Sequence, residues 1–153
     1  MRPTPIPALP APLWRHLAAA LYDLLALVGL WFLAGAVALA LTGGALDAHR
    51  PAHKLLLQAL TLGASAGYFV LSWTRGGQTL GLRAWRLRVV RADGGALDAT
   101  QAVLRFAVAL LSLAALGAGF WWALADRERR TWHDLVARTR VVWAEGGGPR
   151  AEG

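Results

Sequence analysis

Three long apolar runs dominate the chain, and short polar segments separate them. The runs cover residues 13–41, 53–73 and about 99–124. Each comes near the roughly 20 residues that a helix needs to cross the hydrocarbon core of a bilayer. The pattern therefore predicts an all-α integral membrane protein with three apolar helical segments.

Two short segments have a different pattern. Residues 85–91 alternate between apolar and basic side chains before a Gly pair, and residues 139–143 are rich in Val and Trp. Such segments are typical of strands, and the Gly pair indicates a tight turn. We predict a small cytoplasmic strand pair, then a helix that starts with a capping box from Asp98 to Gln101. A short C-terminal amphipathic helix is predicted over residues 130–137.

The third apolar run has two alternative arrangements. If it crosses the membrane fully, eight basic residues lie on each side, and the positive-inside rule gives no orientation. If it re-enters near Gly117 and Gly119, fourteen basic residues lie on one side, and only Arg50 and Lys54 lie on the other. Against re-entry, such a backbone must be covered by protein. We favour re-entry because it also lets the two predicted strands meet on the same side.

Composition supports a membrane protein and removes other classes. Hydrophobic residues make up 56% of the 153 residues, and the net charge is +7. The basic residues flank the apolar runs, which is typical of sites beside anionic lipid, so nucleic acid is not an expected partner. The chain has no Cys and four scattered His, so neither a metal nor a cofactor is expected. We predict one domain over residues 13–143, with a Pro-rich tail (1–12) and a Gly-rich tail (144–153) that are disordered.

Ionisable and small residues interrupt the first two runs. Asp23 lies about two turns inside the first run, where a charge is costly unless it faces a partner or water. Arg15 lies eight residues earlier, about 80° around the helix and about 12 Å along it, so the two cannot pair directly. Gly63 and Gly67 in the second run form a GxxxG spacing that allows close helix packing. Packing within the chain is favoured there over contact between copies.

Several of these residues together resemble the RDD family of small bacterial membrane proteins, which is named after one Arg and two Asp. The resemblance covers about residues 12–143. The residues that carry it are Arg15, Asp23, the block Gly76-Gly77-Gln78-Thr79-Leu80-Gly81, and the terminal block Arg129-Arg130-Thr131-Trp132-His133-Asp134-Leu135-Val136.

The resemblance assigns positions and a location. By position it makes Arg15 the family Arg and Asp23 the first Asp, with Asp134 as the second and Asp126 as the alternative. Arg138 stands where the family usually has Gly, which puts a tight turn there in doubt. The resemblance implies a multi-pass protein of the bacterial cytoplasmic membrane with its N-terminus in the cytoplasm.

The first functional hypothesis is a small transporter or cation/proton exchanger that acts as an oligomer, as has been proposed for some family members. Asp23 would bind the cation or proton in the membrane. Arg15 would modulate it, and Asp134 or His133 would relay protons on the cytoplasmic side. An oligomer is required because three short segments cannot enclose a pathway alone.

The alternative is a non-catalytic scaffold or accessory subunit. Arg15, Asp23 and Asp134 would then form a static polar network, and the basic strand would bind a partner membrane protein or anionic lipid. An enzyme is not expected, because His133 and Asp134 are adjacent on a predicted helix and point in different directions. Expected partners are therefore membrane lipids and either further copies of the chain or another membrane protein.

Overall fold

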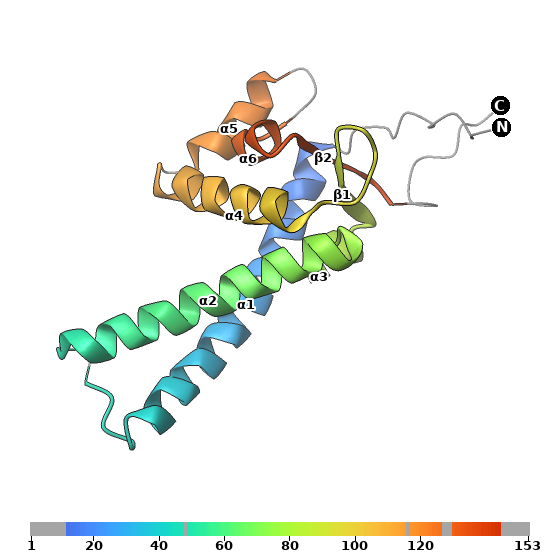
Figure 1. Cartoon of the computed structure of the whole chain (residues 1–153). Coiled ribbons are helices and arrows are strands. Elements are labelled where there is room, and N and C mark those ends of the chain that lie inside the picture. The colour runs from blue at the N-terminus through green and yellow to red at the C-terminus, as the bar shows by residue number, and fades with distance from the viewer. Residues whose placement is uncertain (1–11, 48, 116, 127–129, 145–153) are drawn as a thin grey trace, which may run out of the picture.

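Two long helices form the frame of the molecule. The computed structural model describes residues 12–47, 49–115, 117–126 and 130–144. Helices α1 (Leu13–Leu41) and α2 (Pro51–Gly76) run in opposite directions and are joined at one end by a short loop (Figure 1). At 29 and 26 residues, they are about 43 and 39 Å long, so both are long and apolar enough to cross a membrane.

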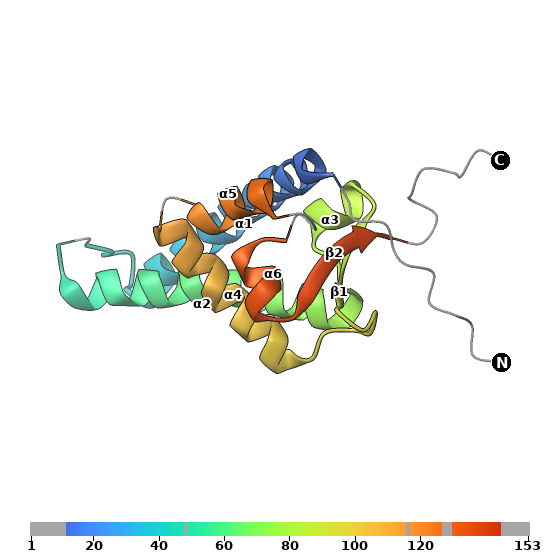
Figure 2. The same cartoon turned by 90° about the horizontal axis from the view of Figure 1, so that it is seen from above.

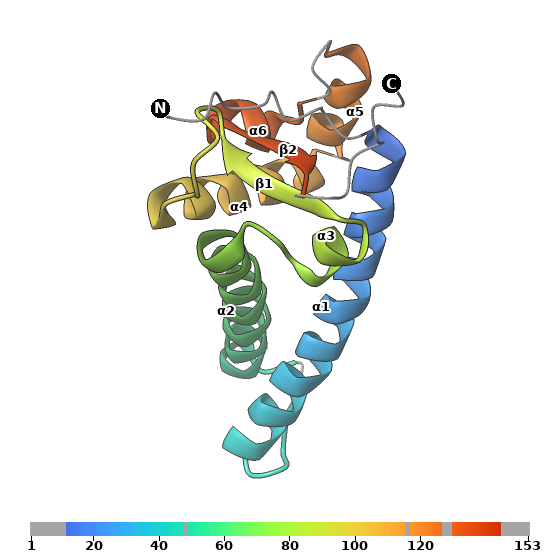
Figure 3. The same cartoon turned by 90° about the vertical axis from the view of Figure 1, so that its right-hand side faces the viewer.

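The remaining elements gather at the opposite end of this pair, where α1 begins and α2 ends (Figures 2 and 3). We call them the cap. In chain order they are α3 (Leu80–Ala84), β1 (Leu87–Arg91), α4 (Ala99–Ala114), α5 (Ala118–Ala125), α6 (Trp132–Val136) and β2 (Thr139–Trp143). The part of the chain that the structure describes is thus mostly helical, with one two-stranded sheet.

The predicted strand pair is confirmed. Strand β1 pairs antiparallel with β2, with Val89 opposite Val141 at the centre of the register. The first strand begins two residues later than predicted because Trp85 ends α3 and Arg86 adopts a left-handed conformation. The predicted capping box from Asp98 to Gln101 starts α4. The C-terminal helix is also present, although it is shorter than predicted.

The third apolar run does not form a membrane-spanning helix. Helix α4 is only 16 residues long and ends at a turn in which Gly117 has a φ of +77°, after which α5 continues for 8 residues. Gly119 packs against Ser112, where a side chain would collide with the hydroxyl. Since β1 and β2 pair, the segments before and after the run lie side by side in the cap. In Figure 3, α4 lies across the end of α2. Only α1 and α2 are long and apolar enough to cross a membrane among the described helices, which agrees with the favoured alternative that the third run does not cross fully.

A compact core joins the cap to the helix pair. It includes Trp73, Leu87, Val89 and Phe106, which come from α2, β1 and α4. Many large apolar side chains of α1 and α2 near their connecting loop are exposed, and Phe32 is 78% exposed. Apolar surface of this extent is expected to face lipid or another protein.

The two glycines of the GxxxG segment do not make the predicted close contact, although Ser65 between them is buried and accepts a hydrogen bond from Trp31 Nε1 of α1 at 2.9 Å. A Cβ atom added to Gly63 or Gly67 would meet no atom within 4 Å. The preferred interpretation, packing against α1, is therefore wrong for these two positions, and contact between copies remains a prediction. The predicted disorder of the tails concerns residues 1–11 and 145–153, which lie outside the described residues.

Candidate functional site: a cavity between the helix pair and the cap

A cavity of about 470 Å³ lies where α1, α2 and α4 meet, and α6 lines one part of it. One face of α1 contributes residues three or four positions apart, from His16 through Asp23 to Trp31. Leucine and aromatic side chains make most of the wall. The polar lining residues are His16, Asp23, Ser65, Thr79, Arg105, Thr131, His133 and Asp134.

The carboxylate of Asp23 is buried and held by three neutral donors. Its Oδ1 accepts hydrogen bonds from the Tyr68 hydroxyl at 2.7 Å and from the Gly81 backbone N–H at 2.8 Å. Its Oδ2 accepts from the Thr79 hydroxyl at 2.6 Å. The Tyr68 hydroxyl in turn accepts from the Leu80 backbone N–H. Asp23 therefore fixes α1 to both α2 and α3.

The family-like block between α2 and β1 forms the binding loop for this carboxylate. Gly76 ends α2, and Gly77 follows with a φ of +67°, which reverses the chain. The Gln78 side chain donates to the Leu87 carbonyl at 2.7 Å, and Thr79 caps α3 by accepting from the Leu82 backbone N–H. Gly81 lies against α1. The structure therefore gives a local reason for Gly77, for Gly81 and for the Thr79 hydroxyl.

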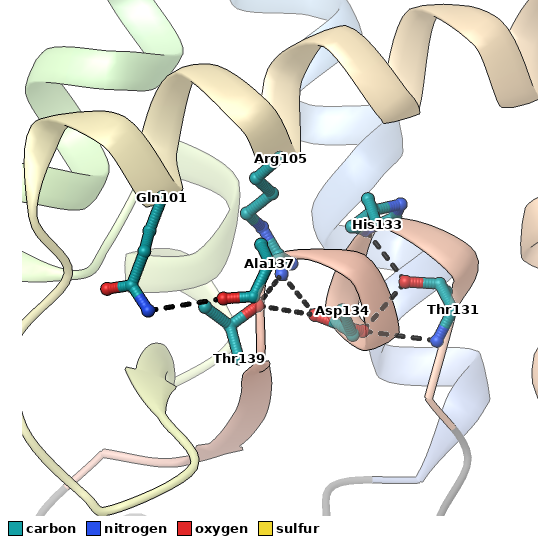
Figure 4. A network of polar contacts seen from close by, with 7 residues as sticks. All are labelled: Gln101, Arg105, Thr131, His133, Asp134, Ala137 and Thr139. Carbon is teal, nitrogen blue, oxygen red and sulfur yellow. Dashed lines mark hydrogen bonds and ion pairs between the residues drawn. The ribbon is translucent and has the colours of Figure 1, made fainter.

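A second network surrounds the other predicted aspartate (Figure 4). The Arg105 guanidinium forms a buried ion pair with Asp134 and donates to the Thr139 hydroxyl at 2.6 Å. The Asp134 Oδ2 accepts from the Thr131 hydroxyl at 2.7 Å and from the Thr131 backbone N–H at 3.2 Å. His133 Nε2 lies 2.8 Å from the same hydroxyl. The network joins α4 to α6 and β2.

Sequence reasoning did not select Arg105 as a site residue and treated it only as a flanking charge. Two signals were available. It is the only charged residue between Asp98 and Asp126 in an otherwise apolar run, and it lies four positions after Gln101, on the same helix face. Gln101 itself donates to the Ala137 carbonyl at 3.2 Å, so this face of α4 holds the C-terminal segment.

Burial and the Arg105 charge set the protonation states in this network. Burial alone would raise the pKa of Asp134, but the adjacent Arg105 guanidinium and the Thr131 hydrogen bond hold it below its usual range. Burial lowers the pKa of His133 to about 3, and the Arg105 charge acts in the same direction. His133 is therefore neutral near pH 7, which does not favour its predicted role as a proton relay.

The His133 environment predicts a loss of stability in mild acid. In the unfolded chain His133 binds a proton near its ordinary pKa of 6.5, whereas in the folded protein it does so only near 3. Stability is complete above pH 6.5 and falls as the pH is lowered, by on the order of 2 kcal/mol at pH 5. Thermal unfolding in detergent at pH 7 and pH 5 measures this. His133→Gln should flatten the pH dependence, whereas the exposed control His49→Gln should leave it unchanged. Equal acid sensitivity of both variants would contradict the assignment.

The structure places Arg15 and Asp126 outside both networks. The Arg15 guanidinium lies over the rings of Trp143 at 4.5 Å, Trp14 at 4.8 Å and Trp85 at 5.7 Å. Asp126 pairs with Arg130 at 3.2 Å, just before α6. Asp23 and Asp134 are brought to one cavity, and Arg15 is not. Within the described residues, no group of three or more metal-ligating side chains is found.

Fold and site together define a small helical protein with two helices of membrane-spanning length. A mostly apolar cavity with several polar lining residues lies between these helices and the cap. The chain belongs to the RDD family, whose model matches residues 10–138. No curated protein and no solved structure matches the chain. Family membership and the two apolar helices together indicate a membrane protein.

Proposed function

We propose that α1 and α2 cross the bacterial cytoplasmic membrane and that the cap and the N-terminus lie in the cytoplasm. Two observations support this topology. The exposed surfaces of both helices are apolar along most of their length. With both ends of the third run at the cap, Arg50 and Lys54 lie near the α1–α2 loop, and the other ten basic residues that the structure describes belong to the opposite side.

In this setting the protein acts as a small cation/proton exchanger. The observation that supports it most is the position of Asp23, which lines the cavity from a membrane-embedded helix. Among the described residues, no Lys, Arg or His nitrogen lies within 4.0 Å of its carboxylate. Buried carboxylates without a cationic partner are typical of ion and proton pathways in membrane proteins. Because two spanning helices cannot enclose a pathway, the working unit is an oligomer.

Proteoliposomes containing the purified protein test exchange directly. A pH-sensitive dye inside the vesicles should report proton movement when Na⁺ or K⁺ is added outside. Asp23→Asn should reduce this flux at least about tenfold, because the neutral amide removes the charge that binds the cation. Asp93→Asn is the matched control, since Asp93 is exposed in the turn after β1, and it should leave the flux unchanged. Absent flux, or equal flux in both variants, would reject the exchanger.

The second candidate function is a non-catalytic scaffold or accessory subunit. The observation that favours it is the buried Arg105–Asp134 network, which ties α4, α6 and β2 together. The basic cap would then bind anionic lipid or a partner membrane protein. Crosslinking in native membranes separates the two functions: a reproducible heteromeric partner favours the scaffold, and a homo-oligomer favours the exchanger. Neither function requires enzymatic chemistry.

A further inference from the structure

The cavity has an uneven charge distribution. Its charged lining residues are Asp23, Arg105 and Asp134. Arg105 and Asp134 neutralise one another as an ion pair. With the histidines counted as neutral, the formal charge of the wall is +1 from Arg105 and −2 from the two carboxylates. One negative charge remains, and it resides on Asp23.

The hydrogen bonding of Asp23 does not use its full acceptor capacity. A carboxylate offers about four lone-pair positions. Tyr68 and Gly81 occupy two on Oδ1, while Thr79 is the one donor to Oδ2 among the described residues. All three donors are neutral, so the carboxylate is oriented but its charge is not balanced.

The wall beside this charge is aromatic. Phe69 lies 5.1 Å from Trp73 and 6.0 Å from Phe106, measured between ring centroids. The Arg105 guanidinium already lies over the Trp73 ring at 5.0 Å, so this cluster accommodates one cation of the protein itself. Aromatic faces attract cations because of their negative quadrupole, and more strongly where water is excluded.

The dimensions suit an organic molecule better than a bare ion. The lining face of α1 extends from His16 to Trp31, which is about 22 Å along the helix. The volume of about 470 Å³ lies within the roughly 300–1,000 Å³ of sites for drug-sized ligands. Most of the wall is apolar, so a small inorganic cation would leave this surface uncovered.

We propose that the cavity binds a lipophilic organic monocation, with its charge near Asp23 and its apolar body against Phe69 and Phe106. The proposal rests on the proposed function in one respect, namely that Asp23 is the cation-binding group. The proposal narrows the substrate to one class, the lipophilic organic monocations. The cavity is a binding site for such cations whether or not the protein transports them. A phospholipid is a poorer occupant because its phosphate would approach an unbalanced carboxylate.

Two ions of the same shape and opposite charge test the proposal. The full-length protein in dodecyl maltoside is equilibrated with tetraphenylphosphonium or with tetraphenylborate, and bound ligand is measured by equilibrium dialysis against protein-free micelles. The phosphonium should bind saturably and the borate should not. Asp23→Asn should weaken phosphonium binding on the order of tenfold to a hundredfold, because a charge interaction in a partly desolvated site is lost.

Substitutions of two alanines on α4 test the same cavity without changing Asp23. Ala109 lines the cavity, whereas Ala107 is exposed on the same helix. Ala109→Phe should fill the cavity and abolish phosphonium binding, and Ala107→Phe should leave it unchanged. This pair keeps the test decisive if Asp23→Asn fails to fold.

Three results would overturn the proposal: borate binding as strong as phosphonium binding, phosphonium binding unaffected by Asp23→Asn and by Ala109→Phe, or a tightly held lipid that the phosphonium does not displace. Other results test the proposed exchange function independently of the organic-cation site. Saturable phosphonium binding with proton flux driven neither by Na⁺ or K⁺ nor by the phosphonium itself rejects the exchanger and keeps the site. Na⁺- or K⁺-driven proton flux without phosphonium binding rejects the organic-cation site and keeps the exchanger.

Discussion

Asp134→Ala is expected to destabilise the protein by about 3–5 kcal/mol. The side chains of Asp134 and Arg105 are 2% and 4% exposed, so the substitution leaves a guanidinium buried without its counter-charge. It also removes the acceptor for the Thr131 hydroxyl and backbone N–H at the start of α6. We expect α6 and β2 to detach from α4 first, because this network joins them. Thermal or denaturant unfolding of the protein in detergent measures the loss.

An exposed ion pair supplies the matched control. Arg91 and Asp93 lie 3.2 Å apart with side chains 42% and 62% exposed. Arg91→Ala should therefore cost less than about 1 kcal/mol. The double variant Arg105→Met/Asp134→Leu should be more stable than Asp134→Ala alone, because it removes both charges together. If Asp134→Ala is as mild as Arg91→Ala, the network is not a buried contributor to stability.

The elements that the sequence predicts well have strong local signals. The first two apolar runs are longer than 20 residues, and both form long helices. The strand of residues 139–143 was predicted with its observed bounds, and its pairing with the first strand followed from placing both on one side. The capping box of α4 depends on residues three positions apart. In each case the determining interactions lie within a few residues of sequence.

The elements that the sequence predicts poorly depend on contacts between residues far apart in the chain. Helix α3 has five residues, too few for a helical period to be recognised, and it is fixed by the Thr79 cap and by Asp23 of another helix. The break in the third run was located from Gly117 and Gly119, but the apolar residues around them gave no helix boundaries. Apolarity alone therefore left full crossing and re-entry open, and the placement of both strands on one side favoured the incomplete crossing.

The candidate site was predicted in part for the same reason. Asp23 and Asp134 were selected because charges are costly in apolar surroundings, and both line the cavity. Their partners on other helices, from Arg105 to Gly81, lie 29 to 58 residues away, and spacing gives no information on such pairs. Arg15 was grouped with the aspartates through the family resemblance, yet its guanidinium contacts tryptophans. The sequence suggested Arg15 as the cation of the polar network, whereas in the structure Arg105 is the cation that pairs with Asp134.

The Asp23 contacts also explain why a glycine is required at position 81. The Gly81 backbone N–H can reach the carboxylate at 2.8 Å only if α3 lies directly against α1. A Cβ at this position would collide with the Ala19 carbonyl oxygen and would lie 2.9 Å from the Asp23 Cγ. The backbone of α1 cannot yield there without breaking its own helical hydrogen bonds.

Gly81→Ala should therefore separate α3 from α1 and cost about 3 kcal/mol or more, combining overpacking with a weakened hydrogen bond to a charged acceptor. Gly76→Ala is the matched control, because a Cβ there meets no atom within 4 Å and Ala favours a helix more than Gly does. It should be neutral or stabilise by up to about 1 kcal/mol. Unfolding midpoints of both variants in detergent measure the difference. Because α3 positions Thr79 and Gly81 on the carboxylate, Gly81→Ala should also weaken any ligand that binds at Asp23. If Gly81→Ala matched Gly76→Ala in stability, α3 would not be packed against α1 in the way that orients this carboxylate.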